Sequence, residues 1–305
     1  MNEIGRKIAD KLIEIHGSTD FRIAFLPYKR SMWNCMESVY EECQRSGAAA
    51  YCIPIPYYRV VNGKIEGLDS DRDLFDKACS VSFLEQNTFD FVVIHYPYDG
   101  NNKVTRMCSP FYTAELRKYG NVVYIPYSCT NMRQLWVQPG IANIDYAFVS
   151  SEYAAEAFVK EWLSLGVDFS GRVFGFGSPK IDAVKNIEAP KNEIFTALVI
   201  NSLAPFLRAP FEKIKIYKQI ISEEIGAGHD VIFRPHPLLR QTIKSMRPDT
   251  EAEYDRLLYW IRSRGGVVDE SEFLESALER ADILISDPSS VLEMWQSTGR
   301  EYKVI

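Results

Sequence analysis

The stretch "ADILISDPSSVLEMW", Ala281–Trp295, joins a strand-like run to a helix-like run. The residues Ile283–Ile285 form a short apolar run, as in a strand that is buried on both faces. The run ends at Ser286, and Asp287 and Pro288 follow, with Pro288 suited to the first position of a helix. A buried strand that leads directly into a helix is the building unit of a parallel sheet. This stretch therefore predicts an α/β fold.

The same alternation of apolar runs and helical segments extends over the whole chain. In the first half the predicted strands are "RIAFL", "AAYCIPI", "FDFVVIHY", "NVVYIPY", "YAFVS" and "RVFGFG". In the second half they are "IFTALVIN", "DVIFRP", "GVVDE", "ADILIS" and "EYKVI". Helical periodicity separates them, as in "SMWNCMESVYEECQRSG" and "SSEYAAEAFVKEWLSLG". We expect an α/β protein with two doubly wound domains that face each other across a cleft.

A polar segment, "GSPKIDAVKNIEAPKNE", separates the two sets of strands. It contains proline and glycine and no long apolar run, so it is interpreted as the region of the linker. The expected boundaries are residues 1–180 for the first domain, 181–192 for the linker and 193–305 for the second domain. Within the first domain, "VVNGKIEG" contains an Asn62-Gly63 pair, which predicts a small hairpin.

Composition excludes several classes of protein. The chain has 305 residues, of which 46% are hydrophobic and 25% are charged, as in globular proteins of more than one domain. The net charge of −6 argues against a nucleic-acid partner. No apolar run approaches the roughly 18 residues that cross a bilayer, and the N-terminus lacks a signal-peptide core. Six scattered cysteines without a Cys-x-x-Cys pair predict free thiols and no zinc site.

Ser289 and Ser290 lie at the predicted start of the last helix. The N–H groups of a first helical turn have no partners within the helix and can bind an anion, and serine hydroxyls add donors. The alternative is an ordinary cap, with Ser286 or Asp287 as the N-cap residue and no ligand. This stretch alone leaves both interpretations open.

The segment "VIFRPHPLL", Val231–Leu239, provides a second polar strand end. Two prolines flank His236, exclude a helix interior and favour extended backbone at the residues before them. Arg234 and His236 are therefore held on a stiff segment just past a strand. Arg234 carries a permanent charge, and His236 can donate to a phosphate or move a proton. A lone histidine is more often structural, but its place beside arginine at a strand end favours a functional role.

Other predicted strands also end in polar residues. Ser202 follows the first strand of the second domain, and His95 ends "FDFVVIH" in the first domain. Lys180 lies at the domain junction, in "GFGSPKIDAV". Ligands of doubly wound sheets bind beyond the carboxyl ends of the strands, so these residues are candidates for ligand binding. The alternative is that they belong to ordinary loops without a ligand. Neither the G-x-G-x-x-G fingerprint nor a G-x-x-x-x-G-K-[ST] loop occurs.

Taken together, these motifs resemble the CDP-glycerol glycerophosphotransferase family, whose members build teichoic-acid and related polymers. The likeness rests on "FRPHPLLRQTIKSMRP" and "ISDPSSVLEMWQSTGR", with "GSPKID" before them. The likeness to the first domain of a clostridial-type branch of that family rests on "FLPYKRSMWNCMESVYEEC", "YCIPIPYYRV", "VIHYPYD" and "VVYIPYS". The resemblance covers most of the chain. It implies a GT-B fold of two Rossmann-like domains, the first on the acceptor side and the second binding the nucleotide donor.

The resemblance also implies roles for individual residues. His236 matches the histidine of the family's Pro-His-Pro segment, which contacts the donor phosphates or assists the leaving group. Ser289 and Ser290 match paired serines on the pyrophosphate, and Asp287 matches an aspartate that orients them. Ser202 and Lys180 are expected to complete the donor site, and Arg234 is expected either to aid it or to stabilise its own loop. Phosphoryl transfer depends on placement and charge stabilisation, which such groups supply, and no carboxylate cluster predicts a metal.

The acceptor's proton needs a base, and here the sequence departs from the family. Many members carry a histidine in a Trp-His-Gly stretch at a strand end of the first domain. This chain has Ser128 at the matching position, in "YIPYSCTNM", so His95 is the residue expected to replace that histidine. The chain also ends at Ile305 on a predicted strand, where GT-B folds usually continue with helices. Either a compact or a shortened member of the fold is therefore expected.

The expected function is transfer of a glycerol-phosphate or other polyol-phosphate unit from CDP-glycerol or CDP-ribitol to a hydroxyl of a cell-surface polymer precursor, with release of CMP. No other cofactor is expected. The alternatives are another GT-B glycosyltransferase, a UDP-sugar epimerase, and a catalytically impaired nucleotide-binding homologue. A cytoplasmic location is expected. The helical spacing of Ile4, Ile8, Leu12 and Ile15 predicts a helix whose apolar face packs on the domain. Acceptors of this family are often lipid-linked, so the alternative for this helix is peripheral contact at the inner face of the membrane.

Overall fold

The structure is a computed structural model that describes residues 2–61, 64–101, 105–129, 136–185, 187–188, 190–271 and 274–305. Two compact units are present, the first formed by residues up to Val60 and by Lys64–Ala183, the second by Val184–Ile305. The division between Ala183 and Val184 lies inside the segment expected to hold the linker, and the helix α7 (Lys180–Lys185) spans it. Within the described residues, no helix is long and apolar enough to cross a membrane.

The first unit contains a six-stranded parallel sheet in the order β2-β1-β5-β7-β8-β9. Its strands are β1 (Arg22–Phe25), β2 (Ala49–Cys52), β5 (Phe91–Ile94), β7 (Asn121–Tyr124), β8 (Tyr146–Phe148) and β9 (Val173–Phe174). Each corresponds to one of the six runs predicted as strands. Every residue of β5 is buried, as expected for a strand with both faces covered.

Helices cover both faces of this sheet. One core joins alternate strand residues such as Ile23 and Val93 to α1 (Glu3–His16) and α2 (Glu37–Arg45). The other joins the intervening residues, such as Val92, to α6 (Glu152–Ser164) and the short helices α3 and α4. The bounds of the last two are Val81–Glu85 and Thr113–Leu116. This alternation follows from the two-residue repeat of a strand.

The N-terminal helix packs on the domain as its apolar spacing predicts. Ile8 and Leu12 on α1 are fully buried against the sheet and α2. Gly5 lets the two helices approach closely, because a Cβ atom there would lie 2.6 Å from the backbone of Ser38. The segment predicted as one helix from Ser31 to Gly47 is divided: a 3-10 helix, η1 (Arg30–Cys35), precedes α2.

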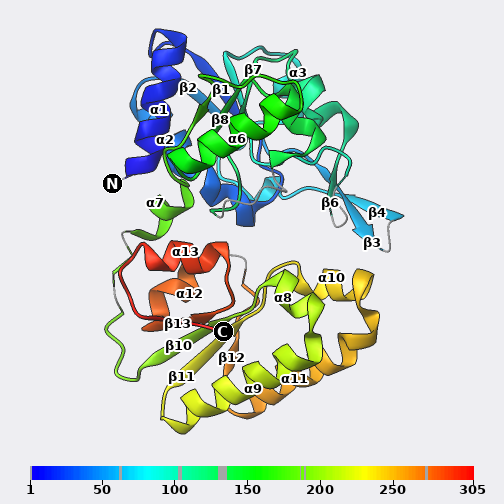
Figure 1. Cartoon of the computed structure of the whole chain (residues 1–305), viewed down its shortest axis with the longest axis vertical. Helices are drawn as coiled ribbons and strands as arrows, with labels where there is room; N and C mark the ends of the chain where they lie inside the picture. The colour runs from blue at the N-terminus through cyan, green and yellow to red at the C-terminus, as the bar shows by residue number, and fades with distance from the viewer. Residues whose placement is uncertain are drawn as a thin grey trace. The chain divides into compact units, whose positions relative to one another are not determined.

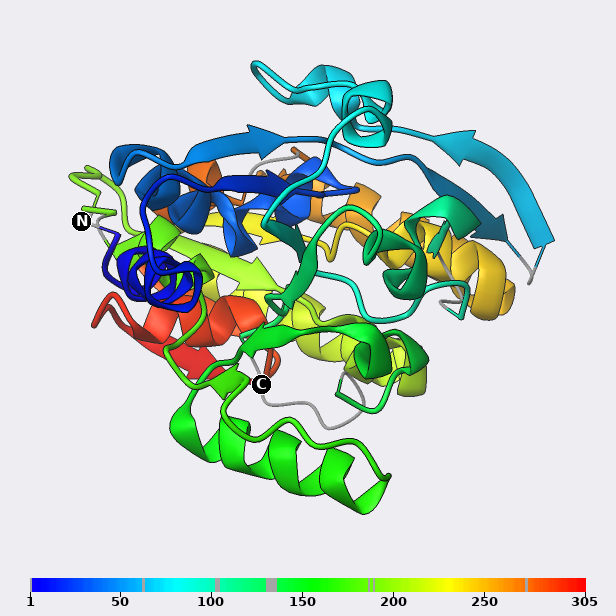
Figure 2. The same ribbon diagram turned by 90° about the horizontal axis from the view of Figure 1, so that it is seen from above.

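A small three-stranded sheet, in the order β4-β3-β6, extends the first unit. Its strands are β3 (Tyr57–Val61), β4 (Lys64–Asp69) and β6 (Thr105–Met107), and β3 and β6 are antiparallel. Figure 2 shows β3 and β4 as a neighbouring pair that reaches away from the parallel sheet. The turn residues Asn62 and Gly63, on which the predicted hairpin rests, lie outside the described residues. Short 3-10 segments complete the unit: η2 (Arg72–Leu74), η3 (Ser109–Phe111) and η4 (Pro139–Asn143).

The second unit contains a five-stranded parallel sheet in the order β12-β11-β10-β13-β14. Its strands are β10 (Thr196–Ile200), β11 (Asp230–Arg234), β12 (Val267–Val268), β13 (Ile283–Ser286) and β14 (Tyr302–Val304), again as predicted. Its helices are α8 (Leu203–Arg208), α9 (Pro210–Gly226), α10 (Leu239–Met246), α11 (Glu251–Ser263), α12 (Glu275–Arg280) and α13 (Ser290–Gln296), with η5 (Pro248–Thr250) between α10 and α11. In Figure 1, α9 and α11 lie together on one side of the sheet, and α12 and α13 lie on the other. The central strand β10 is flanked by β11 and β13, so their carboxyl ends are neighbours.

An unusual cap closes the start of α1. The side chain of Asn2 makes no cap hydrogen bond, and the buried carboxylate of Asp182 on α7 accepts instead from the N–H groups of Ile4 (3.1 Å) and Gly5 (2.7 Å). Orphan N–H groups of a first helical turn need such acceptors, and a carboxylate also suits the positive end of the helix dipole. Asp182 therefore ties the end of the first unit's chain to its beginning.

We expect Asp182→Ala to lower the free energy of unfolding by about 2 kcal/mol, because two buried N–H groups lose their acceptor. Asp182→Asn retains one carbonyl oxygen and should lose less. Asp10→Ala, at an exposed position of the same helix, is the matched control and should change the value by less than about 0.5 kcal/mol. Urea unfolding followed by circular dichroism measures all three, and equal losses for Asp182→Ala and Asp10→Ala would contradict the capping role.

Candidate functional site

The carboxyl ends of β11, β10 and β13 bring most of the predicted donor-site residues to one edge of the second sheet. Arg234 ends β11, and His236 lies two residues beyond it. Ser202 follows the central strand β10, while Asp287 and the two serines follow β13. Since neighbouring parallel strands lie about 4.8 Å apart, groups at the ends of these three strands are within reach of one small ligand.

His236 is fixed by two hydrogen bonds. Its backbone N–H donates to Oδ1 of Asn201 (2.9 Å), and its ring Nδ1 accepts from the N–H of Leu238 (3.1 Å). Asn201 is 1% exposed and His236 is half-buried. Ring placement is therefore set by the neighbouring strand and by the residues just after the Pro-His-Pro segment.

Arg234 is engaged within the protein. Its Nη1 donates to Asp269 Oδ2 (2.7 Å) and Ser271 Oγ (3.0 Å), and its Nη2 donates to the Ser271 carbonyl (2.8 Å). Burial tends to raise the pKa of Asp269, but hydrogen bonds from Ser271 and the nearby Arg234 guanidinium outweigh it, so the pKa lies below its ordinary value. In this structure Arg234 braces the loop after β12.

Asp287 is also engaged, at the centre of a buried network. Its Oδ1 accepts from Lys213 Nζ (2.5 Å), and its Oδ2 accepts from the Ser202 N–H (3.1 Å) and the Tyr217 hydroxyl (2.7 Å). Burial, followed by the charge of Asp287, raises the pKa of Tyr217, which keeps that hydroxyl a donor. Ser202 Oγ completes the network by donating to the Pro288 carbonyl (3.0 Å). The orienting role expected for Asp287 is compatible with these contacts.

The helix after β13 starts later than the sequence suggests. Its N-cap is Ser289, whose Oγ accepts from the N–H of Leu292 (3.2 Å), and Ser290 is the first helical residue. The prediction of Pro288 at the first helical position is wrong, as is the alternative of Ser286 or Asp287 as the N-cap. Pro288 is exposed before the cap, and Ser286 Oγ donates to the Asp287 carbonyl (2.7 Å).

His95 lies in the first unit within an aromatic cluster. Its ring stacks on Tyr28 (centroids 4.9 Å apart) and meets Tyr96 edge-on (5.6 Å). The side chain is 0% exposed, and Nε2 receives a long hydrogen bond from the Tyr28 N–H (3.5 Å). Burial, with a smaller contribution from the charge of Lys180, lowers the pKa of His95 to about 3. A base acting near neutral pH needs contact with its substrate and a higher pKa, so both features disfavour His95 in that role.

Lys180 and Ser128 also belong to the first unit. Lys180 is half-buried in the first turn of α7, and its charge is close enough to lower the pKa of His95. Ser128, at the position matched to the family's histidine, is buried.

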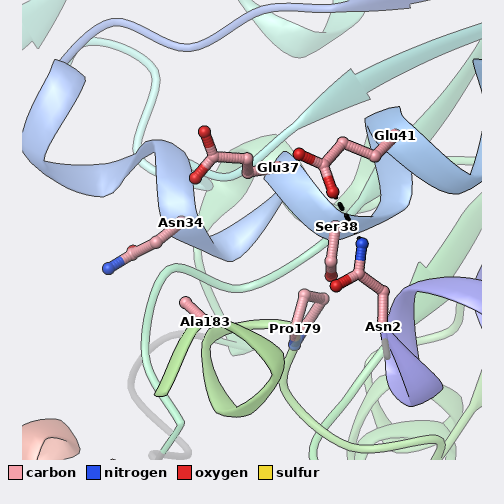
Figure 3. A pocket seen from close by; sticks show the side chains of 7 residues that line it. All are labelled: Asn2, Asn34, Glu37, Ser38, Glu41, Pro179 and Ala183. Carbon is pink, nitrogen blue, oxygen red and sulfur yellow. Dashed lines mark hydrogen bonds between the residues drawn. The ribbon is translucent and has the colours of Figure 1, made fainter. Parts of the chain in front are cut away.

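A cavity of about 200 Å³ lies elsewhere in the first unit, where α1, η1, α2 and α7 begin or end. It is lined by Asn2, Asn34, Glu37, Ser38, Glu41, Pro179 and Ala183, as Figure 3 shows. Asn2 Nδ2 donates to Glu41 Oε2 (2.7 Å) across its wall. None of the residues predicted for the donor or the acceptor site lines this cavity.

Sequence reasoning missed the partners that hold the predicted residues. Lys213 and Tyr217 lie inside α9 and look like ordinary helical residues in the sequence. Asp269 could have been found, because it follows the short apolar pair of β12 next to a strand that ends in arginine. Asn201 stands at a strand end, but its contact with His236 depends on the strand order. Among the described residues, no group of three or more His, Cys, Asp or Glu side chains is arranged to hold a metal ion.

We expect Asp287→Asn to lower the free energy of unfolding by about 3–5 kcal/mol, because Lys213 loses a buried partner. Asp287→Asn combined with Lys213→Met should recover part of the loss. Asp255→Asn removes the exposed pair with Arg240 and should cost less than about 1 kcal/mol. Urea unfolding measures these values, and an Asp287→Asn loss no larger than that of Asp255→Asn would show that the network does not hold the edge together.

The buried His95 predicts a pH dependence of stability. Its folded pKa of about 3 lies below its ordinary value of 6.5, so the unfolded chain binds more protons between these two values. Stability should therefore fall as the pH drops from 6.5 towards 3, by up to about 1.4 kcal/mol per pH unit from this group. His95→Gln should flatten the dependence in that window. An unchanged pH profile of the urea midpoint in the variant would contradict the buried neutral imidazole.

No protein-family model matches this sequence, and no curated protein matches it. Several solved structures are similar. The UDP-GlcNAc 2-epimerase of Methanocaldococcus jannaschii, solved with UDP-GlcNAc and UDP, is 14% identical, with a TM-score of 0.60 over 93% of this chain and 83% of that one. The UDP-GlcNAc 2-epimerase of Neisseria meningitidis is also 14% identical, with a TM-score of 0.58 over 93% and 82%.

The wall teichoic acid polymerase TagF is 10% identical to this chain, with a TM-score of 0.54 over 98% of this chain and 73% of that one. At these identities the likeness establishes the fold. Together with the two parallel sheets and their helices, it shows that the chain is an α/β protein of the GT-B type, with two Rossmann-like domains.

Proposed function

We propose that the protein is a transferase that moves a glycerol-phosphate or other polyol-phosphate unit from a CDP-polyol to an acceptor hydroxyl of a cell-surface polymer precursor, releasing CMP. The observation that carries this proposal is the placement of His236 at the edge of the second sheet, beside the end of β10, which lies between β11 and β13. The Pro-His-Pro and Ser-Asp-Pro-Ser-Ser segments that resemble the glycerophosphotransferase family both lie at this edge. Likeness to a teichoic acid polymerase is consistent with the proposal.

The proposed reaction needs an acceptor hydroxyl, a group that stabilises the leaving phosphate, and a base. The acceptor oxygen attacks the phosphorus that bears the polyol, and the bond from that phosphorus to the bridging oxygen breaks, leaving the electron pair on CMP. His236 stabilises the charge on the phosphate of the leaving group, with donors at the start of α13 beside it. A base takes the acceptor's proton, and the buried ring of His95 would have to become exposed to serve as that base.

A second candidate is a UDP-sugar enzyme, such as an epimerase or glycosyltransferase. It is favoured by the UDP-GlcNAc 2-epimerases, which have somewhat higher TM-scores than the polymerase. A third is a nucleotide-binding homologue without transferase activity, which the burial of His95 favours. For the leading proposal the donor is CDP-glycerol or CDP-ribitol, no further cofactor takes part, and the protein works in the cytoplasm on an acceptor that is lipid-linked at the inner face of the membrane.

Titration calorimetry of the full chain with CDP-glycerol, CMP and UDP-GlcNAc separates these candidates. We expect CDP-glycerol to bind, and His236→Ala to weaken it by at least about tenfold, because a hydrogen bond to a charged phosphate is lost. His229→Ala is the matched control: His229 lies at the amino end of the same strand, paired with Glu224, and its loss should leave affinity unchanged.

Each binding result supports a different one of the candidate functions. Binding of UDP-GlcNAc without binding of CDP-glycerol would overturn the proposal in favour of the UDP-sugar enzyme. Binding of CDP-glycerol with no release of CMP in the presence of glycerol-phosphate oligomers would favour the inactive homologue. Equal affinities of the His236→Ala and His229→Ala variants would remove His236 from the donor site.

A further inference from the structure

The Pro-His-Pro segment leaves few backbone donors around its histidine. Pro235 and Pro237 have no N–H group, so residues 235–238 carry only the N–H groups of His236 and Leu238. Both are used to place the histidine: the first donates to Asn201 Oδ1 (2.9 Å) and the second to the histidine's own Nδ1 (3.1 Å). One bond fixes the backbone and the other fixes the ring.

The second bond determines the tautomer of the ring. A neutral imidazole has one nitrogen that donates and one that accepts. Because Nδ1 of His236 accepts from the N–H of Leu238, Nδ1 carries no proton, and the ring proton is on Nε2. In this state His236 offers a donor through Nε2, as contact with a phosphate oxygen requires.

Asn201 is suited to hold this arrangement. It directly follows β10, whose last residue Ile200 is paired with Arg234 of β11, so its side chain crosses to the neighbouring strand end. It is 1% exposed, and its Nδ2 makes a longer contact with the Ser202 carbonyl (3.4 Å), which sets the orientation of the amide. A buried polar side chain with both ends engaged has little freedom to turn.

We infer that Asn201 is a positioning residue for His236, and that the two residues present an Nε2–H donor to the leaving phosphate of the donor substrate. The role in turnover rests on the proposed function, whereas the tautomer is a property of the ligand-free protein. Asn201 supplies the fixed backbone, Leu238 supplies the fixed ring, and His236 supplies the donor. The chemical class of ligand is a nucleoside diphosphate ester.

Long-range ¹H–¹⁵N correlation spectra of the full chain, labelled with ¹⁵N-histidine, test the tautomer directly. The chain has four histidines, and their signals are assigned through single His→Ala variants. Above pH 7.5 we expect wild-type His236 as the Nε2–H tautomer, and a mixture of tautomers in Asn201→Leu. Asn201→Asp retains the Oδ1 acceptor and should retain the tautomer.

Asn192→Leu is the control: Asn192 lies four residues before β10 begins, and its Nδ2 donates to the Arg280 carbonyl (2.8 Å). It should leave the His236 signals unchanged. An Nδ1–H tautomer in the wild type would overturn the inference without any variant. An unchanged tautomer in a folded Asn201→Leu would remove Asn201 from the positioning role.

Kinetics of CMP release from CDP-glycerol give the second readout. Asn201→Leu should lower kcat by about 100-fold with little change in KM, because the donor is misplaced in the transition state. Asn201→Asp should recover part of that rate. If the tautomer is as expected but CDP-glycerol does not bind, only the proposed function fails. If CMP is released at the wild-type rate by Asn201→Leu, only the positioning role fails.

Discussion

The buried carboxylate of Asp287 joins three elements at the edge of the second sheet. It follows β13, and it accepts from Lys213 and Tyr217 on α9 and from the backbone at the start of α8. A buried charge of this kind is tolerated only with such partners. Because the network fixes where β10 and β13 end, it also fixes the neighbourhood in which Asn201 holds His236.

The same network changes the electrostatics expected of the site. Two cations contact residues at the strand ends, and each has a buried carboxylate partner: Arg234 pairs with Asp269, and Lys213 pairs with Asp287. Their charges therefore stabilise the loops that follow β12 and β13. In the proposed donor site, a phosphate would therefore depend on neutral donors, chiefly His236 Nε2 and the start of α13, and such donors gain strength where water is excluded.

The strands could be predicted from the sequence, and the contacts of the polar residues could not. All eleven predicted strands are present, because uninterrupted apolar runs between helical segments have few other interpretations.

The first residue of α13 could not be predicted. Ser286, Asp287 and Ser289 are all good N-cap residues, and only the tertiary contacts of Asp287 decide between them. The sequence leaves two roles open for Arg234, contact with a ligand and stabilisation of its loop, and its pairing with Asp269 depends on the order of strands, which the sequence does not contain. His95 was found at a strand end, as expected, but its burial comes from tyrosines of three different loops.

The most direct test of the account is a crystal structure of the full chain with CDP-glycerol. The account predicts a pyrophosphate oxygen within about 3 Å of His236 Nε2, with the Asn201–His236 hydrogen bond intact and the start of α13 facing the same group. A nucleotide whose phosphates lie away from the ends of β10, β11 and β13 would contradict it.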